Sequence, residues 1–419
     1  MFIYRTISYS LNRALHRCVQ IRKHRISQTL HRHNHNFNKP KVVLGIETSC
    51  DDTGVAVVDT DGQILGEALH SQTEIHVEQG GINPSTAQTL HREHIQNVVS
   101  TALERARKSL QDLDAIAVTV EPGLTLCLRI GVDYAKELVA QSRLPMIPVH
   151  HMQAHALTAR MLEKIEFPFL VLLISGGHSI LTLAQDVDRY LTIGNGLDTS
   201  PGDCLEKVAR RLNLNSLSQC KSLSGGAAVE LMARGGNPHK FPFSVPLVKE
   251  PSCNFSFSGL RSQAERIIEV EKNQEGISDS EVIRDVSDFC ASLQHCVAFQ
   301  ICRRLQRAFA FCTMQGLLPS HPTLVVSGGV ASNLFIRQCL QQVCSENSAR
   351  LICPPPKLCT DNGIMIAWNG IEKLKVGRGI SEDPQSETYR ARSPIGENIA
   401  DEVTKIGLKI PPLKLKIQP

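Results

Sequence analysis

One strand–turn–strand pattern occurs twice in the chain, and this repeat constrains the fold more than any other feature of the sequence. The first copy, residues 42–58, has two apolar β-branched runs on either side of a polar turn. The second copy, residues 169–183, has the turn Ser-Gly-Gly-His-Ser between two further apolar runs. Short β-branched runs bounded by turn residues predict β-strands. Two halves that clasp one nucleotide require such a repeated unit, with a turn in each copy that can approach a phosphate.

The rest of the chain alternates between strand and helix patterns. Strands are expected at 113–120, 146–149, 351–354 and the start of 323–333, and helices at 88–107, 130–140, 282–314 and 364–374. This alternation predicts an α/β fold. A chain of 419 residues exceeds one ordinary core and therefore indicates two lobes.

The domain organisation follows from where these patterns restart. An N-terminal α/β lobe is expected at 42–165 and a C-terminal α/β lobe at 166–390, because the strand pattern restarts at Phe169. Polar, helical sequence predicts a helical insertion in the second lobe at about 195–300. Residues 391–419 form a basic tail, whose end at 405–416 contains two prolines and is expected to be loosely ordered.

The first forty residues contain eight Lys or Arg residues and no Asp or Glu. Interleaved Ser, Leu, Ile and Val residues make this segment basic and amphipathic, which is typical of a mitochondrial transit peptide. We assign residues 1–38 to the transit peptide and expect the protein in the mitochondrial matrix; a basic arm that binds nucleic acid is the alternative. The remaining chain has 37 Lys and Arg residues against 41 Asp and Glu residues, so a nucleic-acid partner must be bound by local basic patches.

Composition argues against two classes of protein. The longest apolar runs, such as 169–174, are far too short to span a bilayer, so no membrane partner is expected. The fourteen cysteines include no Cys-x-x-Cys pair, which argues against a zinc ribbon, and the length of the chain argues against a disulfide framework. We expect most cysteines to be reduced and buried.

Two histidines have the spacing of metal ligands. His151 and His155 are four residues apart, which places both imidazoles on one face if this segment is a helix. They can then bind the same cation, but a tight site needs a third ligand from elsewhere. Two partly exposed polar residues without a metal are the alternative. Asp361 lies in the opening turn of the expected helix 364–374, where an N-cap is the commonest role of an Asp.

Two further stretches carry side chains suited to a nucleotide or to proton transfer. The turn after the first strand presents Thr48, Ser49, Asp51, Asp52 and Thr53. Hydroxyls and backbone N–H groups suit a phosphate, and the two carboxylates suit a metal or a proton; a hairpin with a polar tip is the alternative. At 323–333 a strand is followed by Gly-Gly and Asn333, which suits a nucleoside lying over the glycines.

Six motifs in this order resemble the tRNA threonylcarbamoyladenosine transferase family, and in particular its mitochondrial branch. They are Gly45-Ile-Glu-Thr-Ser-Cys-Asp-Asp-Thr-Gly54, His151-x-x-x-His155, Ser175-Gly-Gly-His178, Phe255-Ser-Phe-Ser-Gly-Leu260, Ser327-Gly-Gly-Val-x-x-Asn333 and Cys359-Thr-Asp-Asn-Gly363. The resemblance covers about residues 42–390. Any one motif is weak evidence, whereas six in register are highly specific.

The resemblance implies an actin/Hsp70/sugar-kinase-like fold with two related lobes around a central cleft. It implies transfer of the threonylcarbamoyl group from threonylcarbamoyl-AMP to N6 of the adenosine 3′ of the anticodon, in tRNAs that read ANN codons, forming t6A. The implied cofactor is one divalent metal ion per subunit, either iron or zinc. The implied partners are tRNA and a separate synthase that supplies the adenylate donor, and a homodimer is expected.

The family's site residues carry over onto this sequence by motif. His151, His155 and Asp361 are implied to hold the metal. The adenylate pocket is implied to be lined by Leu173, Ile174, Ser175, Gly176, Gly177, Glu206, Gly226 and Asn333. Glu206 stands where the family usually has an Asp that contacts the ribose. Asp52, with Asp51 beside it, matches an acidic position important for catalysis, and we favour Asp52 as the group that takes the proton of the amine.

Other reaction classes compete with this interpretation. His-x-x-x-His suggests a metal-dependent glycoprotein endopeptidase, but zincins need Glu after the first His, where this chain has Met152. A small-molecule kinase or another carbamoyltransferase of the same fold, and a chaperone-like ATPase, are further alternatives. A solvated helix face is the favoured interpretation of the candidate basic residues for a tRNA surface, which are Arg160, Lys164, Arg210, Arg211, Arg303, Arg304 and Arg307.

Overall fold

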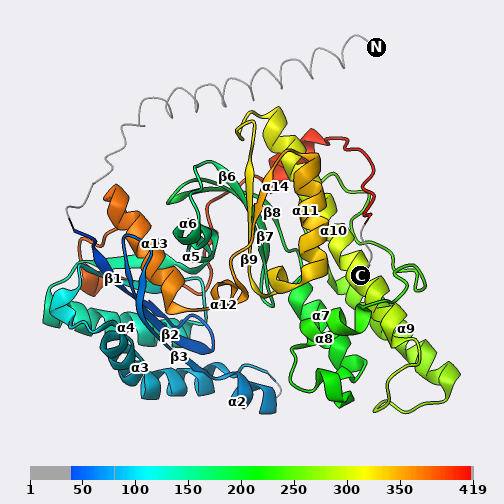
Figure 1. Cartoon of the computed structure of the whole chain (residues 1–419), viewed down its shortest axis with the longest axis horizontal. Helices are drawn as coiled ribbons and strands as arrows, with labels where there is room; N and C mark the ends of the chain where they lie inside the picture. The colour runs from blue at the N-terminus through cyan, green and yellow to red at the C-terminus, as the bar shows by residue number, and fades with distance from the viewer. Residues whose placement is uncertain (1–38, 80, 417–419) are drawn as a thin grey trace, which may run out of the picture.

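Two lobes, each built on one mixed β-sheet, make up the part of the chain that the computed structural model describes, residues 39–79 and 81–416 (Figure 1). The predicted transit peptide, residues 1–38, lies outside the described residues. The first sheet has the strand order β3-β2-β1-β4-β5, and the second has the order β10-β9-β6-β7-β8-β11.

The first sheet is organised around the central strand β1 (Val42–Glu47). This strand pairs antiparallel with β2 (Asp52–Asp59) and parallel with β4 (Ala115–Glu121). The outer strands are β3 (Ile64–Ser71) and β5 (Met146–His150). All of β1 is buried because helices cover both faces of the sheet, which explains its uninterrupted apolar run.

Helices α3 (Pro84–Ala106) and α4 (Thr125–Ser142) share a core with the side chains of Val42, Leu44 and Ile46. Val43 points to the opposite face, where it shares a core with α13 (Gly363–Val376). This alternation is the period-two geometry of a strand. Helix α13 approaches β1 so closely that the contact requires glycine: a Cβ on Gly45 would lie 2.2 Å from the backbone nitrogen of Ala367.

The second sheet repeats the pairing of the first. Strand β6 (Phe169–Ile174) pairs antiparallel with β7 (Ser179–Asp186) and parallel with β9 (Thr323–Ser327), as β1 pairs with β2 and β4. The repeat predicted from residues 42–58 and 169–183 is therefore present in the sheet topology. The remaining strands are β8 (Arg189–Asn195), β10 (Arg350–Ile352) and β11 (Glu397–Asn398).

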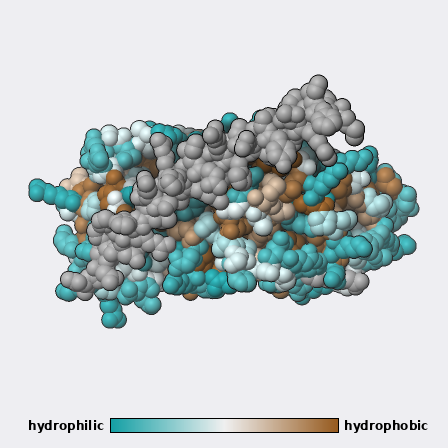
Figure 2. Space-filling view, turned by 90° about the horizontal axis from the view of Figure 1, so that it is seen from above, coloured by the Kyte–Doolittle hydropathy of each residue, from teal (hydrophilic) through white to brown (hydrophobic). Residues whose placement is uncertain are grey.

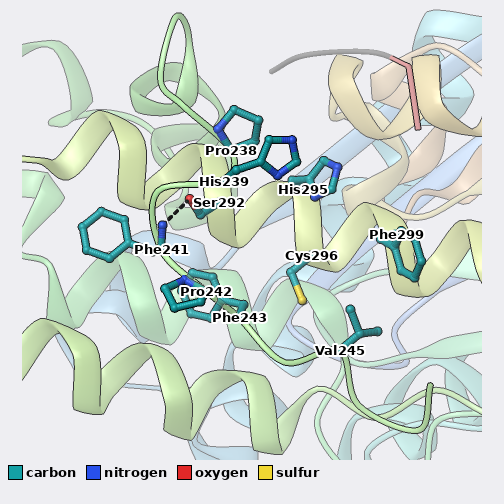
Figure 3. Close-up of a pocket in the computed structure, with 10 residues that line it drawn as sticks. All are labelled: Pro238, His239, Phe241, Pro242, Phe243, Val245, Ser292, His295, Cys296 and Phe299. Atoms are coloured by element: carbon teal, nitrogen blue, oxygen red, sulfur yellow. Dashed lines mark hydrogen bonds between the residues drawn. The ribbon is translucent and has the colours of Figure 1, made fainter. Parts of the chain in front are cut away.

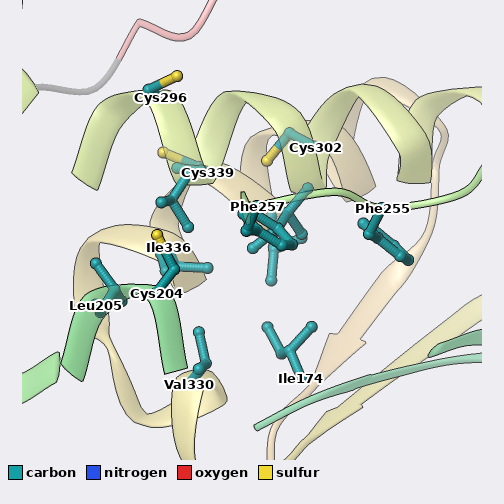
Figure 4. Close-up of a cluster of buried hydrophobic side chains, with 14 of the residues drawn as sticks. Ile174, Cys204, Leu205, Phe255, Phe257, Cys296, Cys302, Val330, Ile336 and Cys339 are labelled. Carbon is teal, nitrogen blue, oxygen red and sulfur yellow. The ribbon is translucent and has the colours of Figure 1, made fainter. Parts of the chain in front are cut away.

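The long helix α10 (Val286–Met314) is the centre of the second lobe's core. Around it pack α7 (Pro201–Arg211), α8 (Gly225–Ala233), α9 (Ser258–Glu275) and α11 (Leu334–Glu346). Figure 4 shows Cys296 and Cys302 of α10 near Cys204 of α7 and Cys339 of α11, among apolar side chains. Burial raises the pKa of Cys302 well above its ordinary value, so the thiol stays protonated. The described cysteines are free thiols and most are buried, as the composition predicts.

Short helices and turns complete the two lobes. They are α2 (Thr73–Glu78), α5 (His151–Leu157), α6 (Ala159–Leu162), α12 (Pro356–Cys359) and α14 (Ala400–Ile406), with 3-10 helices at Leu110–Asp112, Leu214–Ser216, Ser218–Cys220, Gly329–Ser332 and Pro384–Ser386. Helix α3 begins before the predicted residue 88 because the side chain of Asn83 accepts hydrogen bonds from the backbone N–H groups of Ser85 and Thr86.

The C-terminal segment is packed against the second lobe, which corrects the expectation of a loosely ordered end. Residues 391–416 include β11, which pairs with β8, and α14. Leu413 is buried, and the guanidinium groups of Arg303 and Arg307 donate to backbone carbonyls of Pro411 and Leu408. The two prolines therefore lie in a segment held by side chains of α10.

The surface shown in Figure 2 is hydrophilic over most of both ends of the molecule, with hydrophobic residues in separate patches. Among the described helices, none combines the length and apolar character that crossing a bilayer requires.

Candidate active site

The three predicted metal ligands lie together. Helix α5 begins at His151, directly after β5, and carries His155 one turn later. Asp361 comes from the loop before α13, 206 residues after His155. The Nε2 atom of His155 lies 3.2 Å from Nε2 of His151 and 3.1 Å from Oδ1 of Asp361, and His151 Nε2 lies 3.4 Å from the same oxygen.

These separations suit one small cation. Two ligand atoms at about 2.1 Å from a tetrahedral ion are about 3.4 Å apart, which is close to the three observed distances. Both imidazoles are buried, while the Asp361 side chain is partly exposed. Two imidazoles and one carboxylate form a set that iron and zinc both accept, with room for further ligands from substrate or water.

Glu47 orients His151 and was not singled out as a site residue from the sequence. Its Oε2 accepts from Nδ1 of His151 at 3.1 Å and from the hydroxyl of Thr119 at 2.6 Å, and its Oε1 accepts from the backbone N–H of Ser49. A carboxylate on Nδ1 holds the tautomer that leaves Nε2 free for a metal. The sequence feature that indicates such a role for Glu47 is an acidic residue at the end of a buried apolar strand.

Opposite charges in this cluster stabilise one another. Burial disfavours the charged imidazole of His151, but the carboxylates of Asp361 and Glu47 outweigh this effect and hold its pKa well above the ordinary value. Burial would raise the pKa of Asp361, but His151 and His155 hold that pKa well below the ordinary value. Asp361 is therefore a carboxylate, which is the form that binds a cation.

Asp361 does not cap the following helix. The N-cap of α13 is Asn362, whose side-chain oxygen accepts from the backbone N–H of Met365 at 2.9 Å. The capping role considered for Asp361 is therefore wrong, because its neighbour performs it. The Asp361 carboxylate is free to point towards the two histidines.

Asp52 lies at the start of β2, and its Oδ1 is buried without a hydrogen-bond partner among the described residues. Burial, reinforced by the charge of Asp51, raises the pKa of Asp52 to about 6. A carboxyl group of this kind can exchange a proton near neutral pH. Asp51 is half-buried beside it.

Four glycines of the second lobe face open space. A Cβ added to Gly176, Gly177, Gly226 or Gly329 would meet no atom within 4 Å. These glycines lie in the β6–β7 turn, at the start of α8 and after β9. Backbone N–H groups that are open in this way can approach a phosphate or a nucleoside closely.

The other predicted pocket residues have structural roles in the described chain. The side chains of Leu173 and Ile174 are buried in the cores, so only their backbone can border the opening. Glu206 accepts from the backbone N–H of Gly225, the first residue of α8, at 2.7 Å, while Ser224 is the N-cap of that helix. Asn333 caps α11 by accepting from the N–H of Ile336 and donates to Gln294 at 2.8 Å. Ser175 binds its own turn through the N–H groups of residues 177 and 178.

Four of the basic residues considered for a tRNA surface are engaged inside the molecule. Arg304 is 1% exposed and donates to the carbonyls of Glu250 and Ser252. Arg160 forms two hydrogen bonds with Glu372 at 3.0 and 3.1 Å. Arg303 and Arg307 bind the C-terminal segment, as described above. These four guanidinium groups therefore do not lie on a solvated helix face, because internal oxygens accept their hydrogen bonds.

A separate cavity of about 280 Å³ lies between α10 and residues 238–245 (Figure 3). Its rings of His239 and His295 lie edge to face, and the backbone N–H of Phe241 donates to Ser292 at 3.2 Å. None of its lining residues is a predicted site residue. This cavity is therefore not part of the candidate active site.

Comparison with known proteins identifies close relatives. Residues 63–368 match the family model TsaD, described as tRNA N6-adenosine threonylcarbamoyltransferase. The chain is 50% identical over 378 residues to the Homo sapiens protein "tRNA N6-adenosine threonylcarbamoyltransferase, mitochondrial", covering 90% of this chain and 91% of that one. It is 40% identical over 361 residues to a Rhizobium leguminosarum tRNA N6-adenosine threonylcarbamoyltransferase, covering 85% and 94%.

Solved structures give the fold. Full-length HypF in its phosphate- and nucleotide-bound form is 13% identical, with a TM-score of 0.50 over 81% of this chain and 47% of that chain. Together with the repeated sheet topology, this likeness confirms the predicted actin/Hsp70/sugar-kinase-like fold.

Proposed function

The chain belongs to the tRNA N6-adenosine threonylcarbamoyltransferase family, and from this premise we propose that it transfers the threonylcarbamoyl group from threonylcarbamoyl-AMP to N6 of the adenosine 3′ of the anticodon. The acceptors are mitochondrial tRNAs that read ANN codons, and the product is t6A. The convergence of His151, His155 and Asp361 within 3.4 Å of one another is the observation that carries this proposal. Relatives named as mitochondrial support a location in the matrix.

His151, His155 and Asp361 would hold one divalent ion, iron or zinc. When bound, the ion would supply Lewis acidity towards the carbonyl of the mixed anhydride and the leaving phosphate. Glu47 keeps the proton of His151 on Nδ1 and so presents Nε2 to the ion. Asp361, held as a carboxylate, offsets the charge of the ion.

Other residues are proposed to bind the nucleotide and to transfer the proton. The open backbone at Gly176, Gly177, Gly226 and Gly329 accommodates the adenylate. Asp52 accepts the proton of the N6 amine, since its raised pKa lets it both take and release a proton near neutral pH. The amine is a weak nucleophile, so alignment of donor and acceptor supplies a large share of the acceleration, on the order of several kcal/mol.

The reaction requires two partners besides the acceptor tRNA. A separate synthase makes threonylcarbamoyl-AMP, and the enzyme acts as a homodimer; both statements rest on the resemblance of the six motifs. The adenosine must leave its stacked position in the loop to reach the cleft, as recognition of single-stranded RNA bases requires.

The decisive experiment supplies threonylcarbamoyl-AMP and unmodified tRNA to metal-loaded protein and detects t6A by mass spectrometry. Product formation supports the proposal, and its absence from folded, metal-loaded protein contradicts it. Peptide cleavage that a chelator abolishes would favour the endopeptidase alternative, and phosphorylation of a small molecule would favour the kinase.

His155→Ala tests the metal centre directly. Loss of one of three ligands should lower bound metal and t6A together while circular dichroism stays unchanged. Gln153→Ala, on the same helix but outside the cluster, is the matched control and should retain both. Wild-type product formation by His155→Ala would show that the histidine pair is structural.

A further inference from the structure

A second cavity, of about 390 Å³, lies beside the metal centre. Its walls come from the residue after β4, from α5, from β7 and β8, and from residues 391–398. Met152, which follows the predicted ligand His151 on α5, lines it, and so does His178 of the Ser-Gly-Gly-His turn. His178 is close enough to His151, His155 and Asp361 for their charges to act on it, so the cavity adjoins the candidate metal centre.

One unpaired cation faces this cavity. Arg392 lines it and makes no hydrogen bond or ion pair with any residue in 39–79 or 81–416. No Asp or Glu is among the lining residues. Glu121, which precedes the lining residue Pro122, is paired with Arg390 at 3.5 Å. The cavity therefore favours an anionic ligand, and a guanidinium matches a carboxylate in two-point geometry.

The backbone around Arg392 is fixed to both lobes. The carbonyl of Ala391 accepts from the N–H of Gly123 at 3.3 Å, and the carbonyl of Ser393 lies 3.3 Å from Nε2 of His150. Further along, the N–H of Ile399 donates to the carbonyl of Thr192 at 2.9 Å. These bonds hold the backbone of the segment in place across the two lobes, and the exposed side chain of Arg392 extends from this fixed backbone.

The opposite wall combines a buried hydroxyl with apolar surface. Thr192 is 3% exposed, and its Oγ1 has no hydrogen-bond partner among the described residues. A buried hydroxyl without a partner costs free energy unless a ligand or water satisfies it. Ile180 and Ile395 line the same cavity and provide contacts for a methyl group.

We propose that this cavity binds the amino-acid part of the donor, with Arg392 on the α-carboxylate and Thr192 on the β-hydroxyl of the threonyl moiety. The inference rests on the proposed function and adds to it the specificity-determining residues for threonine. A carboxylate, a hydroxyl and a methyl group are the three features that the cation, the buried hydroxyl and the isoleucines match.

Arg392→Met tests the carboxylate contact. Initial rates are measured with threonylcarbamoyl-AMP and with the corresponding adenylate made from threonine amide, which lacks the negative charge. The wild type should prefer the carboxylate donor about 10- to 100-fold, as loss of a charge-assisted hydrogen bond implies. Arg392→Met should raise KM for threonylcarbamoyl-AMP by a similar factor and lose the preference, while KM for tRNA stays unchanged.

Arg390→Met is the matched control, because Arg390 is also an exposed arginine but lies outside the cavity. It should keep the preference for the carboxylate donor. If Arg392→Met instead raises KM for tRNA and leaves the donor preference intact, Arg392 binds RNA and the inference is overturned. A wild type that forms no t6A with either donor would overturn the proposed function itself, which is a separate result.

Thr192→Val tests the hydroxyl contact without changing the shape of the side chain. The wild type should use threonylcarbamoyl-AMP at least tenfold better than the valine-derived adenylate, in which a methyl group replaces the hydroxyl. Thr192→Val should reduce this ratio towards one and leave the midpoint of thermal unfolding unchanged or higher, since it removes an unpaired polar atom. An unaltered ratio would contradict the assignment of Thr192.

Discussion

A buried carboxylate at the end of β1 has a large effect on the chemistry of this site. Glu47 is fully buried, yet its oxygens accept hydrogen bonds from Thr119, Ser49 and His151. Burial raises the pKa of Glu47, but the attraction of His151 outweighs this and lowers it. A buried charge is tolerated only when it is paired and hydrogen-bonded in this way.

Glu47→Gln should weaken metal binding without removing a ligand. The amide keeps the shape of the side chain but loses the charge that orients His151 and favours its Nδ1–H tautomer. Loss of such an outer contact typically costs 10- to 100-fold in metal affinity, which metal titration against a chelator would measure. Glu67→Gln, at the surface on β3, should bind metal like the wild type.

The rate should depend on pH through Asp52. As a base it must be ionised, so kcat/KM should fall as pH decreases through about 6. Asp52→Asn should abolish this fall of kcat/KM at low pH together with most of the activity. Asp51→Asn should still show the fall. A wild-type profile without an acidic limb, over a pH range in which metal remains bound, would contradict the role of Asp52.

Asp52 should also reduce stability near neutral pH. Its pKa in the folded protein, about 6, exceeds the ordinary value of 3.8, so its contribution to stability is present below that ordinary value and is lost as pH rises through 6. Asp52→Asn should therefore raise the midpoint of thermal unfolding at pH 7.5 relative to the wild type. A lower midpoint would show that the carboxylate is stabilised by a partner.

At the scale of elements, close approach of α13 to the first sheet brings Asp361 to the histidines. Glycines permit that approach: a Cβ on Gly45 would lie 2.2 Å from Ala367 N, and one on Gly363 would lie 2.4 Å from Ala56 N. Backbone atoms at these contacts cannot move without shifting the helix. The same residue type serves a different purpose in the β6–β7 turn, where Gly177 borders open space.

Substituting Gly45 and Gly177 should distinguish a glycine needed for close packing from one that borders open space. Gly45→Ala should cost about 3 kcal/mol or more of unfolding free energy, because overpacking against backbone is not easily relieved. Gly177→Ala should leave urea unfolding unchanged but weaken binding of threonylcarbamoyl-AMP. Equal unfolding midpoints for the two variants would contradict the close contact at Gly45.

At the scale of the whole molecule, α10 connects distant segments through arginines that resemble surface residues in the sequence. Arg304 binds carbonyls of the loop 247–252, while Arg303 and Arg307 bind residues 408–411. Burial lowers the pKa of Arg304 to about 10, so it remains charged at neutral pH.

Arg304→Met should destabilise the protein by about 3 kcal/mol or more, since it leaves buried carbonyls without donors. The dependence of tRNA binding on salt should not change in the folded fraction, because no phosphate contact is lost. Chemical unfolding and fluorescence polarisation at several salt concentrations measure these two effects. A smaller salt dependence of tRNA binding in Arg304→Met than in the wild type would show that Arg304 contacts RNA phosphates. Arg210→Met, at an exposed position of α7, is the comparison.

Local chemistry in the sequence determined the repeated strand–turn–strand unit, the alternation of strands and helices, and the residue types of the six motifs. The strands, turns and helices can be predicted because side-chain periodicity and turn preferences act over a few neighbouring residues. The tertiary structure alone decided that Asp361, 206 residues from His155, shares one oxygen with both histidines, and that Glu47 orients one of them. It also placed Arg304 inside and Arg392 beside a cavity, because burial and pairing depend on which distant segments pack together.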